Sequence, residues 1–223
     1  LDHKLLTMLS NFTQHGLHEF LLKILAIFPG ASYTEDAMKN AEKLKNGMRP
    51  GEVYRRQELT EHSTAVDRDL KALVAAGEVQ KLSGGLYYRP QKNAFGGAPP
   101  EDRDLVHVFL KTDDFLLTSY NHYNRLGLGL TQVYNNDIVY NHKRAGDFTL
   151  GGKRFTFRLV PTYPAKLSKE FLLVDLLNNL KRLPDDTASV LENLSAALKA
   201  FDHDKVQDCL ERYGNPGARR VLR

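Results

Sequence analysis

One segment, residues 49–90, constrains the fold of this chain more than any other, because it carries several local signals in a fixed order. The pattern predicts a turn and a short extended segment, a short helix over 55–60, a tight connection, and a longer helix over 64–76. Two short strands then flank Gly84-Gly85, and these glycines permit the positive φ angles of a tight hairpin. Helix, turn, helix and hairpin in this order predict a winged helix-turn-helix.

The predicted helix over 64–76 is amphipathic. Its apolar positions follow the spacing of one helical face, and Gly77 supplies a stop signal. That face consists of Val66, Leu70, Leu73 and Val74. A helix held by such a face can present its opposite side to the major groove of DNA, with its N-terminal residues nearest the base edges.

We therefore predict that this segment binds double-stranded operator DNA. Residues at the start of the longer helix are expected to contact bases or phosphates, and those on the hairpin phosphate or the minor groove. The predicted DNA-binding residues are Arg55, Arg56, Ser63, Thr64, Asp67, Arg68, Lys71, Lys81 and Arg89. Because small winged helices often act in pairs on inverted half-sites, a homodimer on DNA is also expected.

The charge of this segment limits how strongly it can attract DNA. Residues 49–92 contain eight Lys or Arg and six Asp or Glu. We therefore expect only about 4 to 6 phosphate contacts and a shallow dependence of affinity on salt. The alternative is a non-catalytic interaction module, in which the same fold docks a protein partner instead of DNA.

The whole chain of 223 residues is predicted to have an α+β fold in four parts. Local signals include a hairpin turn at Gly151-Gly152 and helix N-caps at Ser168 and in the run Asp202-His203-Asp204. The parts are a helical N-terminal extension at 1–46, the winged helix at 47–92, a linker rich in Gly and Pro at 93–104, and an α+β domain at 105–223 that ends in helices.

Composition excludes several classes of protein. The net charge of +4 is a mild basic excess, and a hydrophobic fraction of 42% is that of a globular protein. The longest apolar stretch, 20–28, is too short to cross a membrane, so a cytoplasmic protein is expected. A single cysteine, Cys209, excludes an internal disulfide framework and a zinc site built on paired cysteines.

A second basic region follows the linker. Residues 111–182 contain eleven Lys or Arg against six Asp or Glu, with tyrosines interleaved among the cations. Such a pattern can stack on and neutralise RNA, or face a toxin, although half-buried strand tyrosines and solvated charges would give the same pattern. The candidate residues for this surface are Tyr123, Asn124, Arg125, Lys143 and Arg144.

Catalytic and metal-binding motifs are not expected. The sequence contains no His-x-x-x-His, His-Glu-x-x-His, Gly-x-Ser-x-Gly or phosphate-binding loop. A nuclease would need convergent groups, and Asp137, Asp147, His122 and His142 are the candidates that would have to meet. We therefore expect no enzyme, no cofactor and no metal.

Four motifs occur in order along residues 45–223. They are Thr64-Ala-Val-Asp-Arg-Asp-Leu-Lys-Ala-Leu-Val-Ala-Ala-Gly; Gly85-Leu-Tyr-Tyr-Arg-Pro, followed by Phe95-Gly96 and Pro99-Pro100; Asn124-Arg-Leu-Gly-Leu-Gly-Leu-Thr-Gln-Val-Tyr; and Tyr213-Gly-Asn-Pro-Gly-Ala-Arg-Arg. In these motifs the chain resembles the AbiEi-like antitoxins, the transcriptional-regulator halves of abortive-infection (AbiE-type) toxin–antitoxin pairs.

The resemblance implies a two-part protein used in phage defence. Its winged helix would bind an operator and repress the operon that encodes it. Its C-terminal domain would oppose a nucleotidyltransferase-like toxin encoded alongside. In such pairs the antitoxin need not form a stable complex with its toxin, so the resemblance implies no particular toxin-binding surface.

Overall fold

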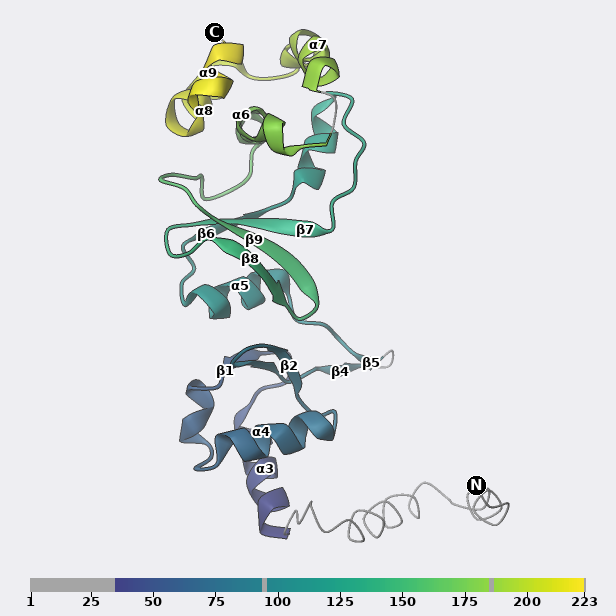
Figure 1. The fold of residues 1–223 in the computed structure, drawn as a ribbon, viewed down its shortest axis with the longest axis vertical. Coiled ribbons are helices and arrows are strands. Elements are labelled where there is room, and N and C mark those ends of the chain that lie inside the picture. Colours follow the sequence, from purple (N-terminus) through teal and green to yellow (C-terminus); the bar gives the residue numbers. More distant parts are fainter. Residues whose placement is uncertain (1–34, 94–95, 185–186, 223) are drawn as a thin grey trace, which may run out of the picture.

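The structure is a computed structural model that describes residues 35–93, 96–184 and 187–222. It is a mixed α+β fold, as predicted. A three-stranded and a four-stranded β-sheet are separated by a helix, and a helical layer lies at the C-terminal end (Figure 1). Residues 1–34 of the helical N-terminal extension expected at 1–46 lie outside the described residues.

Within the described residues 35–88, the chain forms a three-stranded antiparallel sheet of order β1-β3-β2 and three helices. Gly77, with φ of +69°, follows the helix predicted over 64–76 and ends it, as predicted. Gly85, with φ of +74°, lies in the predicted hairpin turn. The elements are α3 (Glu35–Gly47), β1 (Val53–Arg55), the 3-10 helix η1 (Glu58–Glu61), α4 (Val66–Ala75), β2 (Gln80–Ser83) and β3 (Leu86–Tyr88).

A small core holds α4 against α3. Val66, Leu70 and Leu73 of α4 are buried, which confirms most of the predicted apolar face, and they pack with Leu44 of α3. Met38, three residues before the buried Ala41, is 48% exposed. Among the α3 residues whose burial is described, 38–47, the buried ones begin at Ala41, so the core contacts the C-terminal part of this helix.

Two helix boundaries differ from the predictions. Arg55 was expected to begin a helix but pairs with Leu86 across β1 and β3, so the helix that follows is only the short η1. Thr64 was expected inside the longer helix, which instead begins at Val66. The reason is local: the Ser63 hydroxyl accepts a hydrogen bond from the Ala65 N–H and holds this stretch in a turn.

The segment expected to be a linker contains regular structure. The strands β4 (Lys92–Asn93) and β5 (Gly96–Gly97) pair antiparallel, and the helix α5 (Asp102–Leu110) begins before position 105. The apolar run 105–110 therefore belongs to a helix. Lys111 ends this helix in the left-handed conformation, with φ of 57°.

A four-stranded sheet of order β6-β7-β9-β8 forms the middle of the molecule. Strands β7 and β9 are parallel, and the other pairs are antiparallel. The predicted hairpin turn is confirmed between β8 and β9, where Gly151 and Gly152 have φ of +58° and +81°. The strands are β6 (Phe115–Thr118), β7 (Asn136–Asn141), β8 (Gly146–Leu150) and β9 (Lys153–Leu159).

Helices cover both faces of this sheet (Figure 1). The α5 side shares one core with Val139, Phe155 and Phe157, and the opposite side packs Ile138 and Tyr140 against the C-terminal helices. The opposite layer consists of the 3-10 helix η2 (Tyr120–Leu126), α6 (Lys169–Asn179), η3 (Leu180–Arg182), α7 (Thr187–Leu198), α8 (His203–Tyr213) and α9 (Pro216–Val221).

Side-chain caps fix where the C-terminal helices begin. The Ser168 hydroxyl accepts from the Phe171 N–H and the Asp202 carboxylate from the Lys205 N–H, which confirms both predicted caps. The helix α8 ends before Gly214, and α9 follows it. Asn215 caps α9, and a proline in the first helical turn lacks only an N–H that would have no partner there.

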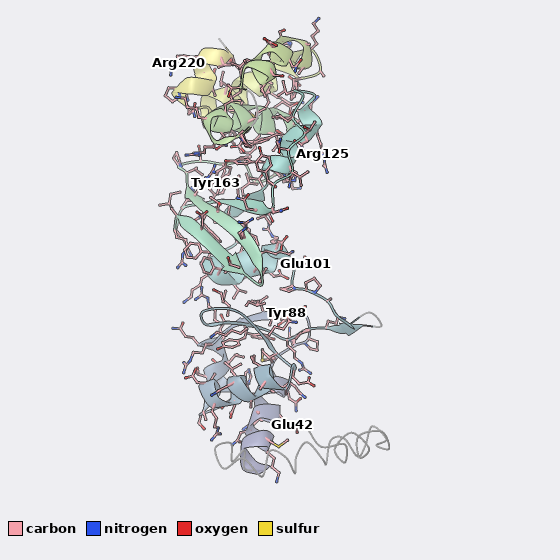
Figure 2. All side chains as sticks on the ribbon, turned by 45° about the vertical axis from the view of Figure 1, so that its right-hand side comes forward. Glu42, Tyr88, Glu101, Arg125, Tyr163 and Arg220 are labelled. Atoms are coloured by element: carbon pink, nitrogen blue, oxygen red, sulfur yellow. The ribbon has the colours of Figure 1, made fainter. Side chains whose placement is uncertain are left out.

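The two sheets share a core through α5. Val53, Leu82 and Leu86 of the first sheet pack with Leu105 and Val106, which also contact the second sheet. The Gly151 N–H donates to the Leu82 carbonyl at 3.0 Å, and the buried Tyr88 (Figure 2) belongs to the same cluster. The segments predicted as winged helix and α+β domain are thus packed directly on each other, with α5 between their sheets.

Candidate nucleic-acid interface

The exposed side of α4 carries the central residues of the predicted DNA-binding surface. Arg68 and Lys71 of α4 and Thr64, just before this helix, are exposed, while the apolar residues of α4 face the core. Lys81, on β2 of the neighbouring hairpin, is exposed as well. These four side chains are accessible on the part of the chain that the structure describes.

Arg56 lies between α4 and the hairpin. Its backbone N–H donates to the Gly85 carbonyl at 2.9 Å, which places it beside the hairpin turn. Its guanidinium Nε and Nη2 donate to the two carboxylate oxygens of Asp67 at 2.7 and 2.6 Å. The hydrogen bonds from Arg56 hold the pKa of the Asp67 carboxyl below its usual value. Two predicted residues thus meet as an exposed bidentate ion pair.

Ser63 and Arg68 both contact a carboxylate that the sequence reasoning missed. Asp69 is 1% exposed; its Oδ2 accepts from the Ser63 hydroxyl at 2.6 Å and its Oδ1 from Arg68 Nε at 3.2 Å. Ser63 is therefore occupied in stabilising the start of α4. A signal for Asp69 does exist in the sequence, because it stands three residues after Val66 and so shares the buried face.

Two predicted residues, Arg55 and Arg89, do not contribute to this surface. Arg55 donates through Nε and Nη2 to the carbonyls of Val108 and Phe109 in α5 at 2.7 and 2.6 Å. Arg89 donates through Nη1 to the carbonyls of Lys45 and Met48 at the end of α3. Unpaired carbonyls at a helix C-terminus carry partial negative charge, and this attracts both guanidinium groups inward.

The second predicted surface is not assembled in the structure. Tyr123 is 1% exposed, so its expected role on an RNA- or toxin-facing surface is wrong: its hydroxyl donates to Asp175 Oδ2 at 2.7 Å in the core. Asn124 donates its side-chain amide to the Gln132 carbonyl at 3.0 Å, and Arg125 is exposed on η2 (Figure 2). The Tyr123 side chain packs inward from η2 because most of its surface is apolar.

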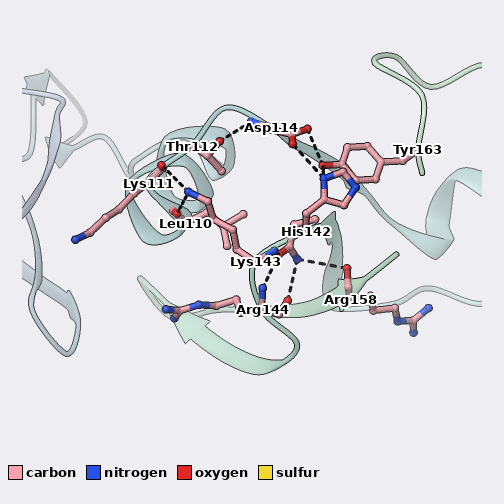
Figure 3. A network of polar contacts seen from close by, with 10 residues as sticks. Leu110, Lys111, Thr112, Asp114, His142, Lys143, Arg144, Arg158 and Tyr163 are labelled. Atoms are coloured by element: carbon pink, nitrogen blue, oxygen red, sulfur yellow. Dashed lines mark hydrogen bonds and ion pairs between the residues drawn. The ribbon is translucent and has the colours of Figure 1, made fainter. Parts of the chain in front are cut away.

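Lys143 and Arg144 lie at the C-terminal end of α5 (Figure 3). Lys143 Nζ donates to the carbonyls of Leu110 and Lys111 at 3.1 and 2.9 Å. The Arg144 guanidinium stacks 4.4 Å from the centre of the Phe109 ring. Both side chains thus hold the junction around α5 together.

The four candidates for chemistry do not converge: His122 and Asp137 interact electrostatically with each other, whereas His142 and Asp147 have other partners. His142 Nδ1 lies 3.2 Å from Asp114 Oδ2 and the ring stacks on Tyr163 (Figure 3), whereas Asp147 accepts from Thr156. Burial is the largest cause of a lowered pKa of His122. Within the described ranges, no cluster of three or more His, Cys, Asp or Glu could hold a metal ion.

Comparison with known proteins adds evidence on the fold. No protein-family model matches the chain, and no curated protein matches it. The structure is similar to the crystal structure of the RV2827C protein from Mycobacterium tuberculosis, with 16% sequence identity and a TM-score of 0.54 over 82% of this chain and 75% of that chain. At this identity the similarity shows a shared fold. Separately, none of the helices in the described residues has the length and apolar content needed to cross a bilayer.

Proposed function

We propose that residues 35–88 form a winged helix-turn-helix that binds double-stranded DNA, and that the chain is a transcriptional repressor. The observation that carries the proposal is the two-sided nature of α4. Val66, Leu70 and Leu73 fix one side of this helix in the core, while Arg68 and Lys71 project from the other. In this assignment α4 is the recognition helix and the β2–β3 hairpin is the wing.

The dimensions of α4 support this assignment. An α-helix is about 10 to 12 Å across with its side chains, which matches a major groove of about 12 Å width, and the 10 residues of α4 are about 15 Å long. Its first turn carries Arg68, and the backbone N–H groups there favour a phosphate oxygen. Lys81 on the hairpin supplies a second cation that can contact the DNA backbone beside the helix.

The antitoxin part of the proposal is supported by the sequence resemblance alone. We propose that the α+β unit built on β6–β9 and the C-terminal helices opposes a nucleotidyltransferase-like toxin. Co-expression of the chain with an adjacent nucleotidyltransferase-like gene should restore growth that this gene alone arrests. Growth arrest that persists despite full-length expression of the chain would remove the antitoxin role and leave DNA binding to be judged separately.

A gel-shift experiment tests DNA binding. The probe is the duplex upstream of the gene for this chain, and the variant is Arg68→Ala with Lys71→Ala. The matched control is Lys166→Ala with Lys181→Ala, which removes the same charge from exposed positions outside α4. Wild type and control should shift the probe, and the α4 variant should not.

Two results would contradict this proposal. Unshifted probe with wild type at low salt would favour the alternative, a module that docks a protein partner through the same fold. Equal loss of binding in the α4 variant and the control would show that net charge, and not the exposed side of α4, determines binding.

A further inference from the structure

The first turn of α4 contains two carboxylates, and each holds an arginine in a different way. Asp67 accepts from both Nε and Nη2 of Arg56, at 2.7 and 2.6 Å. Asp69 accepts from Nε alone of Arg68, at 3.2 Å. The two arginines therefore differ in which of their donors remain available to a ligand.

Asp69 is a rigid support for Arg68. The carboxylate is 1% exposed, and its second oxygen accepts from Ser63 at 2.6 Å. Ser63 in turn accepts from the Ala65 N–H at 2.9 Å, so the backbone before α4 fixes the carboxylate in place. The Arg68 side chain contacts this carboxylate and is still 53% exposed.

The available donors of Arg68 match one base. Within the described ranges, neither Nη1 nor Nη2 of Arg68 has a hydrogen-bond partner, and these two groups form the outer edge of a planar guanidinium. Guanine presents two acceptors, O6 and N7, side by side in the major groove, and arginine pairs with both at once. Holding Nε in advance reduces the rotamer freedom that the side chain loses on binding.

We propose that Arg68 recognises a guanine in the major groove through Nη1 and Nη2, and that Asp69 is the positioning residue that orients it. This inference rests on the proposed DNA-binding function. Because the Asp69 carboxylate offsets the positive charge of Arg68, the pair contributes to base preference more than to overall affinity. Arg56 has a different role, since its bidentate pair with Asp67 occupies Nε and Nη2.

The test begins with duplexes that have a randomised centre, selected for binding to the full-length wild-type chain. Affinity is then measured for the selected duplex and for versions in which each G·C pair is replaced by A·T. Wild type should lose roughly tenfold or more in affinity at one such position. Arg68→Lys keeps the charge but cannot form the two-point contact, so it should bind both duplexes within about twofold.

Asp69→Asn should weaken the same preference at the same position, because its neutral amide oxygen accepts from Arg68 Nε less strongly than the carboxylate does. Two matched variants separate positioning from folding. Val79→Ala truncates a buried side chain of the core that holds α4 and leaves both Arg68 and Asp69 unchanged, so it should keep the guanine preference even though it lowers the melting temperature. Lys71→Ala should weaken binding to both duplexes equally and leave their ratio unchanged.

The outcomes are distinguishable. A guanine preference that survives in Arg68→Lys would show that another residue recognises the base. A preference lost in Arg68→Lys but kept in Asp69→Asn would remove the positioning role of Asp69. If wild type enriches no duplex from the library and binds none, the proposed DNA-binding function fails, and this inference fails with it.

Discussion

At the scale of residues, buried carboxylates organise this molecule. Asp175 of α6 is 3% exposed and accepts from the hydroxyls of Tyr123 and Tyr140, both at 2.7 Å. Asn179 donates to the same carboxylate at 3.1 Å. Burial is the largest cause of the raised pKa of Asp175, and it also raises the pKa of both tyrosines. The network joins η2, β7 and α6, because the Asp175 carboxylate accepts from both tyrosines and Asn179 also donates to both tyrosine hydroxyls.

Asp175→Ala is therefore expected to destabilise the fold strongly. It leaves two buried tyrosine hydroxyls without an acceptor, and the free energy of unfolding should fall by about 3 kcal/mol. Denaturant unfolding followed by circular dichroism measures this change. Asp113→Ala, at an exposed position, is the control and should leave the transition midpoint nearly unchanged; an equally small effect of Asp175→Ala would show that the network contributes little.

At the scale of elements, the local features followed from the sequence and the long-range partners did not. The Ser168 cap, the Gly151-Gly152 turn and the apolar face of α4 depend on residues a few positions apart, and all were predicted. Arg55 and Tyr123 were expected on surfaces, but both bind distant partners. The partners of Arg55 lie 53 and 54 positions away in the sequence, and the partner of Tyr123 lies 52 positions away. No local pattern contains that information, because it depends on how α5 and α6 pack.

Cationic side chains from distant parts of the chain meet at the C-terminal end of α5. Arg55 from β1 binds the carbonyls of Val108 and Phe109, and Lys143 from the β7–β8 loop binds the next two. Cations from both sides of the molecule thus satisfy the last carbonyls of one helix, where its dipole is negative. The chain neighbour Arg56 instead pairs with Asp67 on the proposed DNA-binding side.

Substitution of the two adjacent arginines should separate these roles. Arg55→Ala should lower the free energy of unfolding by about 1 to 2 kcal/mol and leave the base preference of the chain unchanged. Arg56→Ala should leave the thermal midpoint unchanged and change the affinity of the chain for the duplex. Thermal melts and duplex titrations of both variants provide the readout, and an exchange of the two effects would contradict the assigned positions.

At the scale of the whole molecule, the two sheets are parts of one packed body. Leu82 and Leu86 of the first sheet share a core with α5 and with the second sheet. The sequence predicted separate units joined by a linker, because glycines and prolines are typical of linkers. It could not predict the parallel pairing of β7 with β9, or that α5 would contact both sheets, since both features join residues far apart in the chain.

The shared core predicts cooperative unfolding. Leu86 is 2% exposed, so Leu86→Ala should lower the free energy of unfolding by about 2 to 4 kcal/mol. Circular dichroism and tyrosine fluorescence should report one transition at a single lower temperature. Two separate transitions, with only the first shifted by the substitution, would show that the sheets unfold independently.

We propose that α4 and its hairpin bind the DNA backbone through a few exposed cations. Arg55 and Arg89 are engaged with helix carbonyls, so the contacts that remain should give a log–log slope of affinity against salt of about −3 per bound chain. The most direct measurement is that slope, taken by fluorescence anisotropy on the upstream duplex. Lys71→Ala with Lys81→Ala should make it shallower by about 2, while Lys166→Ala with Lys181→Ala should not change it. A slope that is the same in both double variants would contradict the account.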